Sequence, residues 1–225
     1  MIGTLELAVF NAASVQVAFD CSVDRIELCS NYSVGGVTPL FSEFINARKV
    51  FKKNIFVMIR SRPGDFVFSD IEFSEMMEAM ASFKLAGADG FVAGFLNADK
   101  TVNKLQTKMF VDACAPLPVT FHRAIDACEN YFEAVSHVVD CGVKRILSTG
   151  TALSAFEGKV MLNVIQQKYF DRLIVVAGGN VRSQGLSTFL TDGSVTEIHS
   201  AAITMKGSDV ADAVEVNNLI RLLKK

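Results

Sequence analysis

Short apolar runs recur along the chain at nearly even spacing, and small, turn-like phrases precede several of them. Sharing 225 residues among eight such runs leaves about 28 residues for each. One buried parallel strand and the helix that leads to the next strand occupy about that length. The pattern predicts eight strands, which we place at Leu5 to Phe10, Arg25 to Leu28, Ile55 to Arg60, Phe91 to Val92, Leu117 to His122, Arg145 to Leu147, Leu173 to Gly179 and Glu197 to His199.

The segments between these runs carry apolar residues at intervals of three and four, the period of a helix with one buried face. Met76, Met77 and Met80 follow this spacing, and we interpret them as core residues rather than as metal ligands. Asp70 and Glu72 mark the start of the same helix, because they place acids in its first turn. Other helices are expected at about 41–50, 103–113, 131–139, 155–168, 184–190 and 211–223.

Eight strand and helix units that close on themselves form a TIM-type (β/α)8 barrel, which is an α/β fold. At 225 residues the chain is shorter than the roughly 250 residues typical of this fold, so we expect a slightly trimmed barrel. No proline-rich or serine-rich linker interrupts the pattern. We therefore expect one barrel domain over residues 1–225.

The charge balance argues against several classes of partner. The chain has 22 basic and 24 acidic side chains, which leaves no electrostatic footprint for nucleic acid or for an anionic membrane surface. No apolar run reaches the length of a membrane span, and Glu6 interrupts the first run, which argues against a secretory signal. Five cysteines without paired spacing are typical of reduced thiols, so we expect a cytoplasmic protein.

Polar residues gather where the predicted strands end. In a barrel of this kind, the carboxyl ends of the strands form the catalytic face. A buried charge at such an end is costly unless it is paired or used. Four residues there could combine acid and base groups that titrate near neutral pH with a fixed positive charge, and we predict a catalytic site from them: Glu27, Arg60, His122 and His199. The alternative is structural pairing of the same side chains.

Ligand-binding residues are expected at the same face. Gly178-Gly179-Asn180, followed by Arg182, resembles the loops with which barrels hold phosphate, but a glycine pair also simply permits a tight turn. The two longest connections after strands, 30–39 and 61–70, indicate a ligand site as well. No lysine lies within a predicted strand, which excludes a Schiff-base aldolase of the usual type. No feature indicates an organic cofactor.

The usual metal-binding motifs do not occur in the sequence, which has no CxxC pair, no HExxH and no tight carboxylate cluster. Cys29 is the only cysteine at the end of a predicted strand. Because soft thiolates favour Cu(I), Cys29 is a candidate copper ligand. A buried cysteine also serves as a small apolar residue, and that interpretation stays open.

The phrases at the strand ends are distinctive when they are taken in order: Arg25-Ile26-Glu27-Leu28-Cys29, Gly35-Gly36-Val37-Thr38-Pro39, Val57-Met58-Ile59-Arg60 and Thr120-Phe121-His122-Arg123-Ala124. With these phrases the chain resembles the CutC family of copper homeostasis proteins, and the resemblance covers nearly its whole length. The resemblance implies a TIM-type barrel, a cytoplasmic location, homo-oligomers, and a link to copper tolerance or Cu(I) binding.

The first strand departs from the family pattern. Where the family commonly has Glu-Val-Cys-Val-Asp, this chain has Glu6-Leu7-Ala8-Val9-Phe10, so one of the two cysteines that the resemblance associates with copper is absent. Cys29 remains from that pair. Tight Cu(I) binding would then require another soft ligand, such as a nearby Met or His. The polar residues at the barrel mouth are kept better than the thiols.

Three functions are consistent with these observations, and the sequence leaves open whether the protein is an enzyme. The first is copper handling, with Cu(I) held by Cys29. The second is an enzyme for a small phosphorylated or carboxylated compound, with Glu27 and His122 as proton-transfer groups and Arg60 beside an oxyanion. The third is a scaffold without catalysis. For the second, ligand binding is assigned to a further set of residues: Arg62, Asp65, Arg123, Asp126, Thr149, Gly178 and Gly179.

Overall fold

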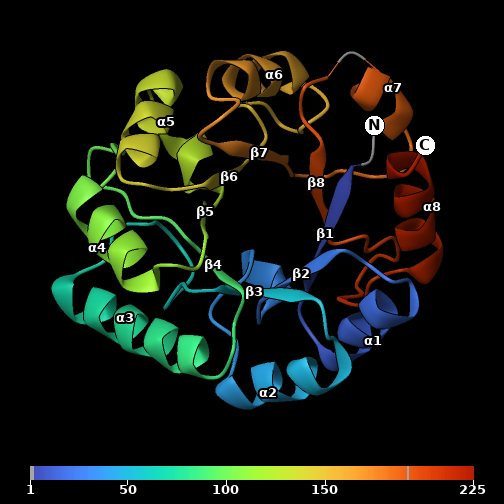
Figure 1. Cartoon of the computed structure of the whole chain (residues 1–225), viewed down its shortest axis with the longest axis horizontal. Helices are drawn as coiled ribbons and strands as arrows, with labels where there is room; N and C mark the ends of the chain where they lie inside the picture. Colours follow the sequence, from blue (N-terminus) through green and yellow to red (C-terminus); the bar gives the residue numbers. More distant parts are fainter. Residues whose placement is uncertain (1–2, 192) are drawn as a thin grey trace.

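The computed structural model describes residues 3–191 and 193–225, which form a closed barrel of parallel strands with helices around the outside (Figure 1). The strands are β1 (Thr4–Val9), β2 (Arg25–Leu28), β3 (Asn54–Met58), β4 (Gly90–Ala93), β5 (Val119–Phe121), β6 (Arg145–Ser148), β7 (Ile174–Ala177) and β8 (Glu197–Ser200). Each strand pairs with its sequence neighbours, and β8 pairs with β1. The prediction of a TIM-type (β/α)8 barrel is confirmed.

The helices between the strands pack against the outer face of the barrel. They are α1 (Ala12–Asp20), α2 (Phe41–Val50), α3 (Asp70–Leu85), α4 (Lys104–Cys114), α5 (Tyr131–Asp140), α6 (Lys159–Lys168), α7 (Leu186–Thr191) and α8 (Ala213–Leu223), with short 3-10 helices η1 (Tyr32–Val34) and η2 (Arg123–Ala127). Helix α3 begins at Asp70 as predicted, because the side chains of Ser69 and Glu72 each accept the other's backbone N–H. None of the helices formed by the described residues is both long and apolar enough to cross a bilayer.

Some boundaries differ from the expected ones for local reasons. Helix α6 begins at Lys159 instead of residue 155, because the chain turns there and the N–H of Ala155 donates to the carbonyl of Gly179. Strand β5 is shorter than the apolar run around it. Pro118 has no N–H to give to a neighbouring strand, and the N–H of Leu117 donates to Cys114 instead.

The main core lies between the outer face of the strands and the helices. Phenylalanine rings dominate it, with Phe91, Phe95 and Phe110 in contact and fully buried. Met76 and Met80 of α3 are buried in the same core, as their helical spacing predicts. Burial of such rings and thioethers supplies the largest favourable contribution to folding.

Inside the barrel, at the amino ends of the strands, lies a buried ion network that consists of Glu6, Arg25, Arg145 and Glu197. Glu6 Oε2 accepts from Arg25 Nε at 2.6 Å and from Arg145 Nη2 at 3.2 Å. Glu197 Oε2 accepts from Arg145 Nη1 at 2.5 Å and also from Arg25 Nη2. Both guanidinium groups lie over the ring of Phe56, 4.9 and 5.3 Å from its centre. Two positive and two negative charges thus face one another inside the barrel.

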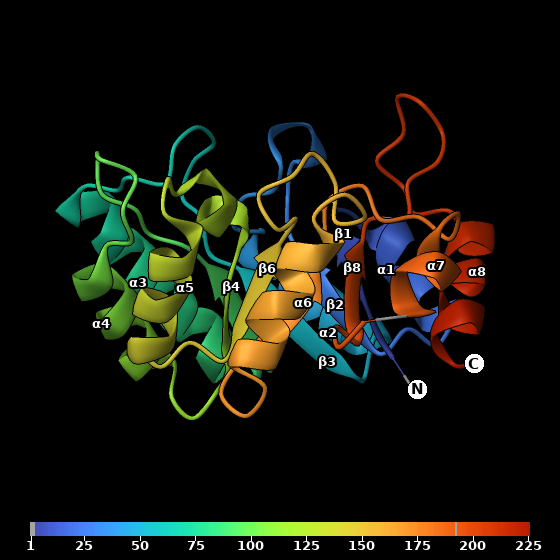
Figure 2. The ribbon, with the colours of Figure 1, turned by 90° about the horizontal axis from the view of Figure 1, so that it is seen from above.

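The loops that follow the strands gather on one side of the barrel, which is the upper side in Figure 2. The loop between β8 and α8 rises furthest there, and the described N-terminal end of the chain lies on the opposite side. The carboxyl ends of all eight strands therefore share one face, and side chains from distant parts of the sequence meet at it.

Replacing Arg145 by Met should lower the free energy of unfolding by about 3–5 kcal/mol, because the buried Glu6 and the largely buried Glu197 would each lose a donor. Chemical denaturation followed by circular dichroism measures this loss. Arg221→Met on the exposed side of α8 is the control, with an expected change within about 0.5 kcal/mol. A loss below about 1 kcal/mol for Arg145→Met would mean that the network does not stabilise the barrel.

Candidate functional site

A cavity of about 220 Å³ opens at the carboxyl ends of the strands. Its lining includes all four residues predicted to form a catalytic site: Glu27, Arg60, His122 and His199. Glu27 lies in β2 and His199 in β8, whereas Arg60 and His122 come just after β3 and β5. Glu27 and His199 point inward because strand residues alternate between the two faces of the sheet, and Arg60 and His122 reach the cavity from the segments that follow their strands. The structure thus brings these four residues to one cavity.

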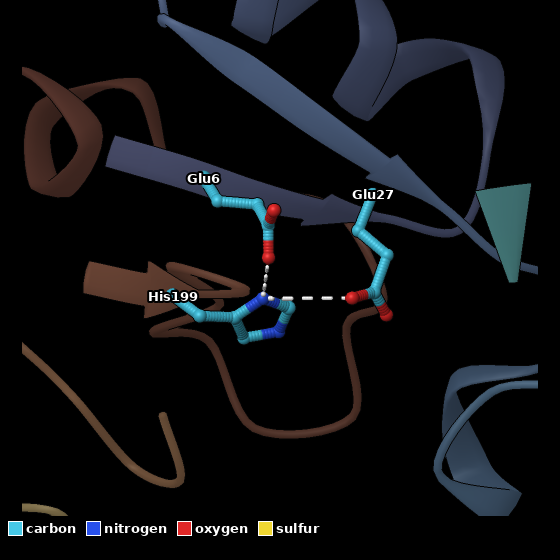
Figure 3. A group of neighbouring side chains, drawn as sticks. All are labelled: Glu6, Glu27 and His199. Carbon is cyan, nitrogen blue, oxygen red and sulfur yellow. Dashed lines mark hydrogen bonds and ion pairs between the residues drawn. The ribbon is translucent and has the colours of Figure 1, made fainter. Parts of the chain in front are cut away.

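At the floor of the cavity, His199 lies between two carboxylates (Figure 3). His199 Nδ1 is 2.8 Å from Glu6 Oε1 and 3.8 Å from Glu27 Oε2. The register explains this proximity, because Glu6 pairs with His199 across β1 and β8, and Ala8 pairs with Glu27 across β1 and β2. The ring turns its Nε2 away from Glu6 (Figure 3). Glu6 therefore holds the Nδ1–H, which leaves Nε2 free of that bond.

Burial and charge shift the pKa values of these three groups in a consistent way. Burial raises the pKa of Glu27, an effect that the nearby His199 reduces and Glu6 reinforces. Burial opposes the charged form of His199, but the Glu27 and Glu6 carboxylates outweigh it and raise the pKa of His199. Burial also acts against the charge of Glu6, yet its bond to His199 and the charges of Arg145 and Arg25 keep the pKa of Glu6 far below its usual range. Glu6 is thus a permanent anion beside two titrating groups.

The same three side chains are close enough to hold a cation, since one ligand atom from each lies within 4.8 Å of the others. Carboxylate oxygens and an imidazole nitrogen would suit Mn²⁺ or Zn²⁺ rather than Cu(I). However, Arg25 and Arg145 already neutralise Glu6, and the ring proton occupies the position that a cation would need. We therefore treat the group as a proton site.

His122 differs from His199 in both its bonds and its charge. His122 Nδ1 accepts a hydrogen bond from the N–H of Ala124 at 3.2 Å, so the ring hydrogen belongs on Nε2. Burial, together with the positive charge of Arg60, lowers the pKa of His122 to about 3. The ring is therefore neutral at pH 7, where it is a poor base. The geometry favours His199 over His122 as the partner of Glu27 in proton transfer.

Arg60 joins the two longest loops of the catalytic face. Its Nη1 donates to the carbonyls of Val34 and Gly36, and its Nη2 donates to the carbonyl of Gly64 at 2.8 Å. The guanidinium group also lies 4.8 Å from the centre of the Phe66 ring. Burial and the charge of Arg62 lower the pKa of Arg60. Most of its donors are thus committed to the backbone, and its Nε alone has no hydrogen-bond partner among the described residues.

Arg123 is more available to a ligand than Arg60. Its Nε donates to Asp126 Oδ2 at 3.2 Å, and its side chain lines the cavity with about half of its surface exposed. Asp126 lies outside the cavity lining and accepts from the N–H of Thr149 and from the hydroxyl of Ser148. Asp126 and Thr149, both predicted to bind ligand, are therefore not in the cavity lining. Asp126 orients Arg123 and, through the N–H of Thr149, holds the loop after β6.

The two glycines after β7 are required by close packing. A Cβ atom at Gly178 would lie 2.3 Å from Leu147 Cδ1, and one at Gly179 would lie 2.4 Å from Thr149 Cγ2. Gly179 also has a φ of +96°, a conformation that favours glycine. Gly179 lines the cavity and Gly178 does not. The turn therefore brings backbone, rather than a side chain, to the edge of the cavity near Arg123.

Arg62 and Asp65, also predicted to bind ligand, lie outside the cavity lining. Arg62 Nη1 donates to Asp65 Oδ1 at 2.9 Å, and Arg62 Nε donates to Glu72 Oε1 at 2.5 Å. Asp65 is mostly exposed. This pair joins the loop after β3 to the start of α3, so the structure does not bring it to the site.

Cys29, the candidate copper ligand, directly follows β2, is 2% exposed and is not part of the cavity lining. Its Sγ is 3.3 Å from Glu27 Oε1, to which the thiol donates. Burial, the charge of Glu27 and that hydrogen bond raise the pKa of the Cys29 thiol well above its usual range. Cys29 packs in a small cluster inside the barrel with Phe56, Met58 and Val92. Met58 is thus the soft side chain that shares the cluster with the thiol.

A model of the CutC family matches residues 3–204. The chain belongs to the CutC family. A CutC protein of Vibrio vulnificus (strain CMCP6) is 36% identical over 197 residues, which span 87% of this chain and 79% of that protein. A human protein named copper homeostasis protein cutC homolog is 35% identical over 204 residues, which span 91% of this chain and 75% of the human protein.

Solved structures agree with the CutC assignment at the level of the fold. The crystal structure of a CutC protein from Streptococcus agalactiae superimposes with a TM-score of 0.84 at 24% identity, over 90% of this chain and all of that chain. Phosphoribosyl anthranilate isomerase from Thermococcus kodakaraensis has a TM-score of 0.68 at 12% identity, over the full length of both chains. The barrel is thus shared well beyond the CutC family.

Several residues of this CutC site were missed by reasoning from sequence. Glu6 interrupts an apolar run in the sequence, and a lone acid inside a buried strand signals a charged partner. The same signal comes from three charged residues that each begin a buried strand and therefore need a partner: Arg25, Arg145 and Glu197. Tyr32 lines the cavity from the short 3-10 helix η1, a segment too short to give a periodic signal. Asn180 and Arg182, which the sequence singles out with the glycine pair, also line the cavity.

Replacing Glu27 by Gln should lower the pKa of His199, because the variant removes the carboxylate that most favours the imidazolium and leaves burial to act against it. The chain has three histidines, so an NMR titration of their ring signals can follow each one. His137 on α5 serves as the internal control. An unchanged or increased pKa of His199 in the variant would contradict the proposed coupling.

Proposed function

We propose that this protein is an enzyme that binds a small anionic compound, phosphorylated or carboxylated, at the barrel mouth and transfers a proton on it. The observation that carries the proposal is the meeting of Glu27 and His199 at the floor of a cavity whose edge is formed by Arg123. The scaffold hypothesis expects internal salt bridges to fill the mouth. Instead, the ion network occupies the amino ends of the strands, and the cavity lies above it.

The two groups at the floor suit acid and base chemistry. Burial raises the pKa of Glu27, which makes its carboxylate a stronger base than an ordinary one. Glu27 Oε2 has no hydrogen-bond partner among the described residues and is thus available to accept a proton. The raised pKa of His199 favours its protonated form, so His199 is suited to return a proton. Glu6 orients that ring and remains charged throughout.

Arg123 supplies the attraction for an anion. Its Nε bond to Asp126 fixes the plane of the guanidinium group, and its two terminal nitrogens form no hydrogen bond with the other described residues. Two parallel N–H groups match the oxygens of a carboxylate or phosphate. Gly179 keeps this edge open, because a Cβ atom there would lie 3.7 Å from Arg123 Nη1. An anion can therefore approach both the guanidinium group and the backbone of the turn.

Inorganic phosphate should bind to the protein, and Arg123→Gln should weaken that binding by about tenfold or more, as loss of a charged hydrogen-bonding pair does. Isothermal titration calorimetry at low ionic strength measures the affinity. Arg62→Gln is the matched control and should bind phosphate like the unchanged protein, because Arg62 lies outside the cavity. Equal losses of phosphate affinity in the two variants would show that Arg123 does not bind the anion.

Copper handling is the second candidate function. A human relative carries copper homeostasis in its name, and Cys29 shares a small buried cluster with Met58. A thiolate and a thioether are ligands that suit Cu(I). Because burial raises the pKa of the Cys29 thiol, Cu(I) binding there would have to release a proton. We propose Cys29 and Met58 as the first two ligands of such a site.

Anaerobic titration with Cu(I) against a competing chelator tests this second function. Cys29→Ala should abolish tight binding, and Met58→Leu should weaken it, because each variant removes one soft donor. Cys114→Ala is the control, since Cys114 is an equally buried thiol of α4 outside the barrel. Unchanged Cu(I) affinity in Cys29→Ala would exclude this thiol as a ligand.

We also propose a cytoplasmic, homo-oligomeric protein whose partner is a copper ion or a small anion rather than nucleic acid or a membrane. All five cysteines are free thiols, which suits a reducing compartment. The near balance of basic and acidic side chains supports the choice of a small ligand over a polyanion.

A further inference from the structure

His122 lies on the wall of the barrel opposite the proton site. In a ring of eight strands, β5 is four strands away from β1, so His122 faces the group formed by Glu6, Glu27 and His199 across the cavity. His122 Nε2 is buried and has no hydrogen-bond partner among the described residues. Because Nδ1 accepts from the N–H of Ala124, the unpartnered Nε2 carries the hydrogen. A buried N–H donor without an acceptor is costly, unless a ligand supplies the acceptor.

The ring of His122 is held firmly in place. Its centre lies 4.9 Å from that of Phe66, whose ring also contacts the guanidinium group of Arg60. The N–H of His122 donates to the carbonyl of Ala93 at 3.0 Å. Gly94 leaves the space that the ring occupies, since a Cβ atom at that position would lie 2.5 Å from His122 Nδ1. The donor is therefore fixed in direction before any ligand arrives, which is what stabilisation of a developing charge requires.

We infer that His122 donates a hydrogen bond from Nε2 to a carbonyl oxygen of the substrate, and that the proton transferred comes from the carbon next to that carbonyl. The substrate class is then an anionic carbonyl compound, such as a keto acid or a phosphorylated ketose. This role concerns the same cavity as the proposed function and rests on it. His122 is a catalytic residue in this scheme, because it touches the reacting oxygen.

The proposed step is the removal of a proton beside a carbonyl group, which forms an enolate. Glu27 takes a proton from the carbon beside the carbonyl, and the electron pair of that C–H bond forms a carbon–carbon double bond. The π electrons of the carbonyl move to its oxygen, which becomes an enolate oxygen bonded to the N–H of His122. Return of a proton from Glu27 or His199 to the same carbon restores the carbonyl compound. In a ketose whose neighbouring carbon carries a hydroxyl group, return of the proton to the former carbonyl carbon gives the isomer, with the hydroxyl proton passing to the enolate oxygen. No oxidant, reductant or second substrate is needed.

A neutral ring is suited to this role. Burial and the charge of Arg60 keep His122 uncharged at pH 7, and because its Nδ1 accepts from the N–H of Ala124, the single ring hydrogen lies on Nε2. On the opposite wall, the pKa values of Glu27 and His199 are raised, whereas that of His122 is lowered. Groups whose surroundings push their pKa values apart are typical of sites that combine a base with a hydrogen-bond donor.

The inference is tested by comparing the binding of two probes. 2-Phosphoglycolate imitates the enolate of a phosphorylated carbonyl compound, whereas inorganic phosphate has no group that reaches His122. His122→Phe should weaken the binding of 2-phosphoglycolate by about tenfold or more and change the binding of phosphate by less than about twofold, because only 2-phosphoglycolate reaches the N–H donor of His122. His122→Gln, which keeps an N–H donor, should recover part of the loss. His137→Phe on α5 is the control and should change neither affinity.

The possible outcomes separate this inference from the function on which it rests. If both probes bind and His122→Phe weakens them equally or not at all, the donor role is wrong and the anion site stands. If the unchanged protein binds neither probe, the proposed function fails and the donor role fails with it. Nitrogen NMR of labelled histidine adds an independent check, since a hydrogen on Nδ1 of His122, or a charged ring at pH 7, overturns the inference without any ligand.

Exchange of substrate hydrogen with solvent gives the direct chemical measurement. Incubation of the protein with dihydroxyacetone phosphate or pyruvate in D2O, followed by proton NMR, should show deuterium at the carbon beside the carbonyl for at least one of the two probes. Glu27→Gln should abolish the exchange and His122→Phe should slow it by about tenfold or more. Exchange that persists at the full rate in His122→Phe would contradict the role of His122.

Discussion

The structure depends on a charged group in a place that barrels usually fill with apolar side chains. Glu6 is fully buried in β1, and Arg25 and Arg145 hold one of its oxygens while His199 holds the other. Each partner comes from a different strand, so the carboxylate links β1, β2, β6 and β8 across the interior. Removing one partner would leave an uncompensated charge inside the barrel. Closure of the barrel and ionisation of Glu6 therefore support each other.

That arrangement determines the chemistry above it. Because the arginines hold Glu6 as an anion, Glu6 can orient His199 without competing for the proton that Glu27 and His199 exchange. The same charge adds to the cost of ionising Glu27 and so contributes to its raised pKa. The stability of the lower barrel and the reactivity of the cavity floor thus come from one network rather than from separate sets of residues.

The sequence was sufficient for the fold and for the place of the site, since apolar spacing fixes the strands and barrel geometry gathers their ends. It was less informative about individual roles. Arg60 and Arg123 look alike in sequence, but only the structure shows that the first bonds loop carbonyls and the second keeps free donors. The two histidines differ through their neighbours, since Arg60 and the backbone of Ala124 adjoin His122 whereas two carboxylates adjoin His199. No periodic pattern encodes these contacts.

The close approach of Gly94 to the ring of His122 has an evolutionary consequence. Substitutions at these two positions depend on each other, because the imidazole fills the volume that any side chain at position 94 would need. Descendants that exchanged His122 for a smaller residue would be released to acquire a side chain at position 94. Once position 94 carries a side chain, a single mutation can no longer restore the histidine at position 122. Loss of this hydrogen-bond donor would therefore be difficult to reverse.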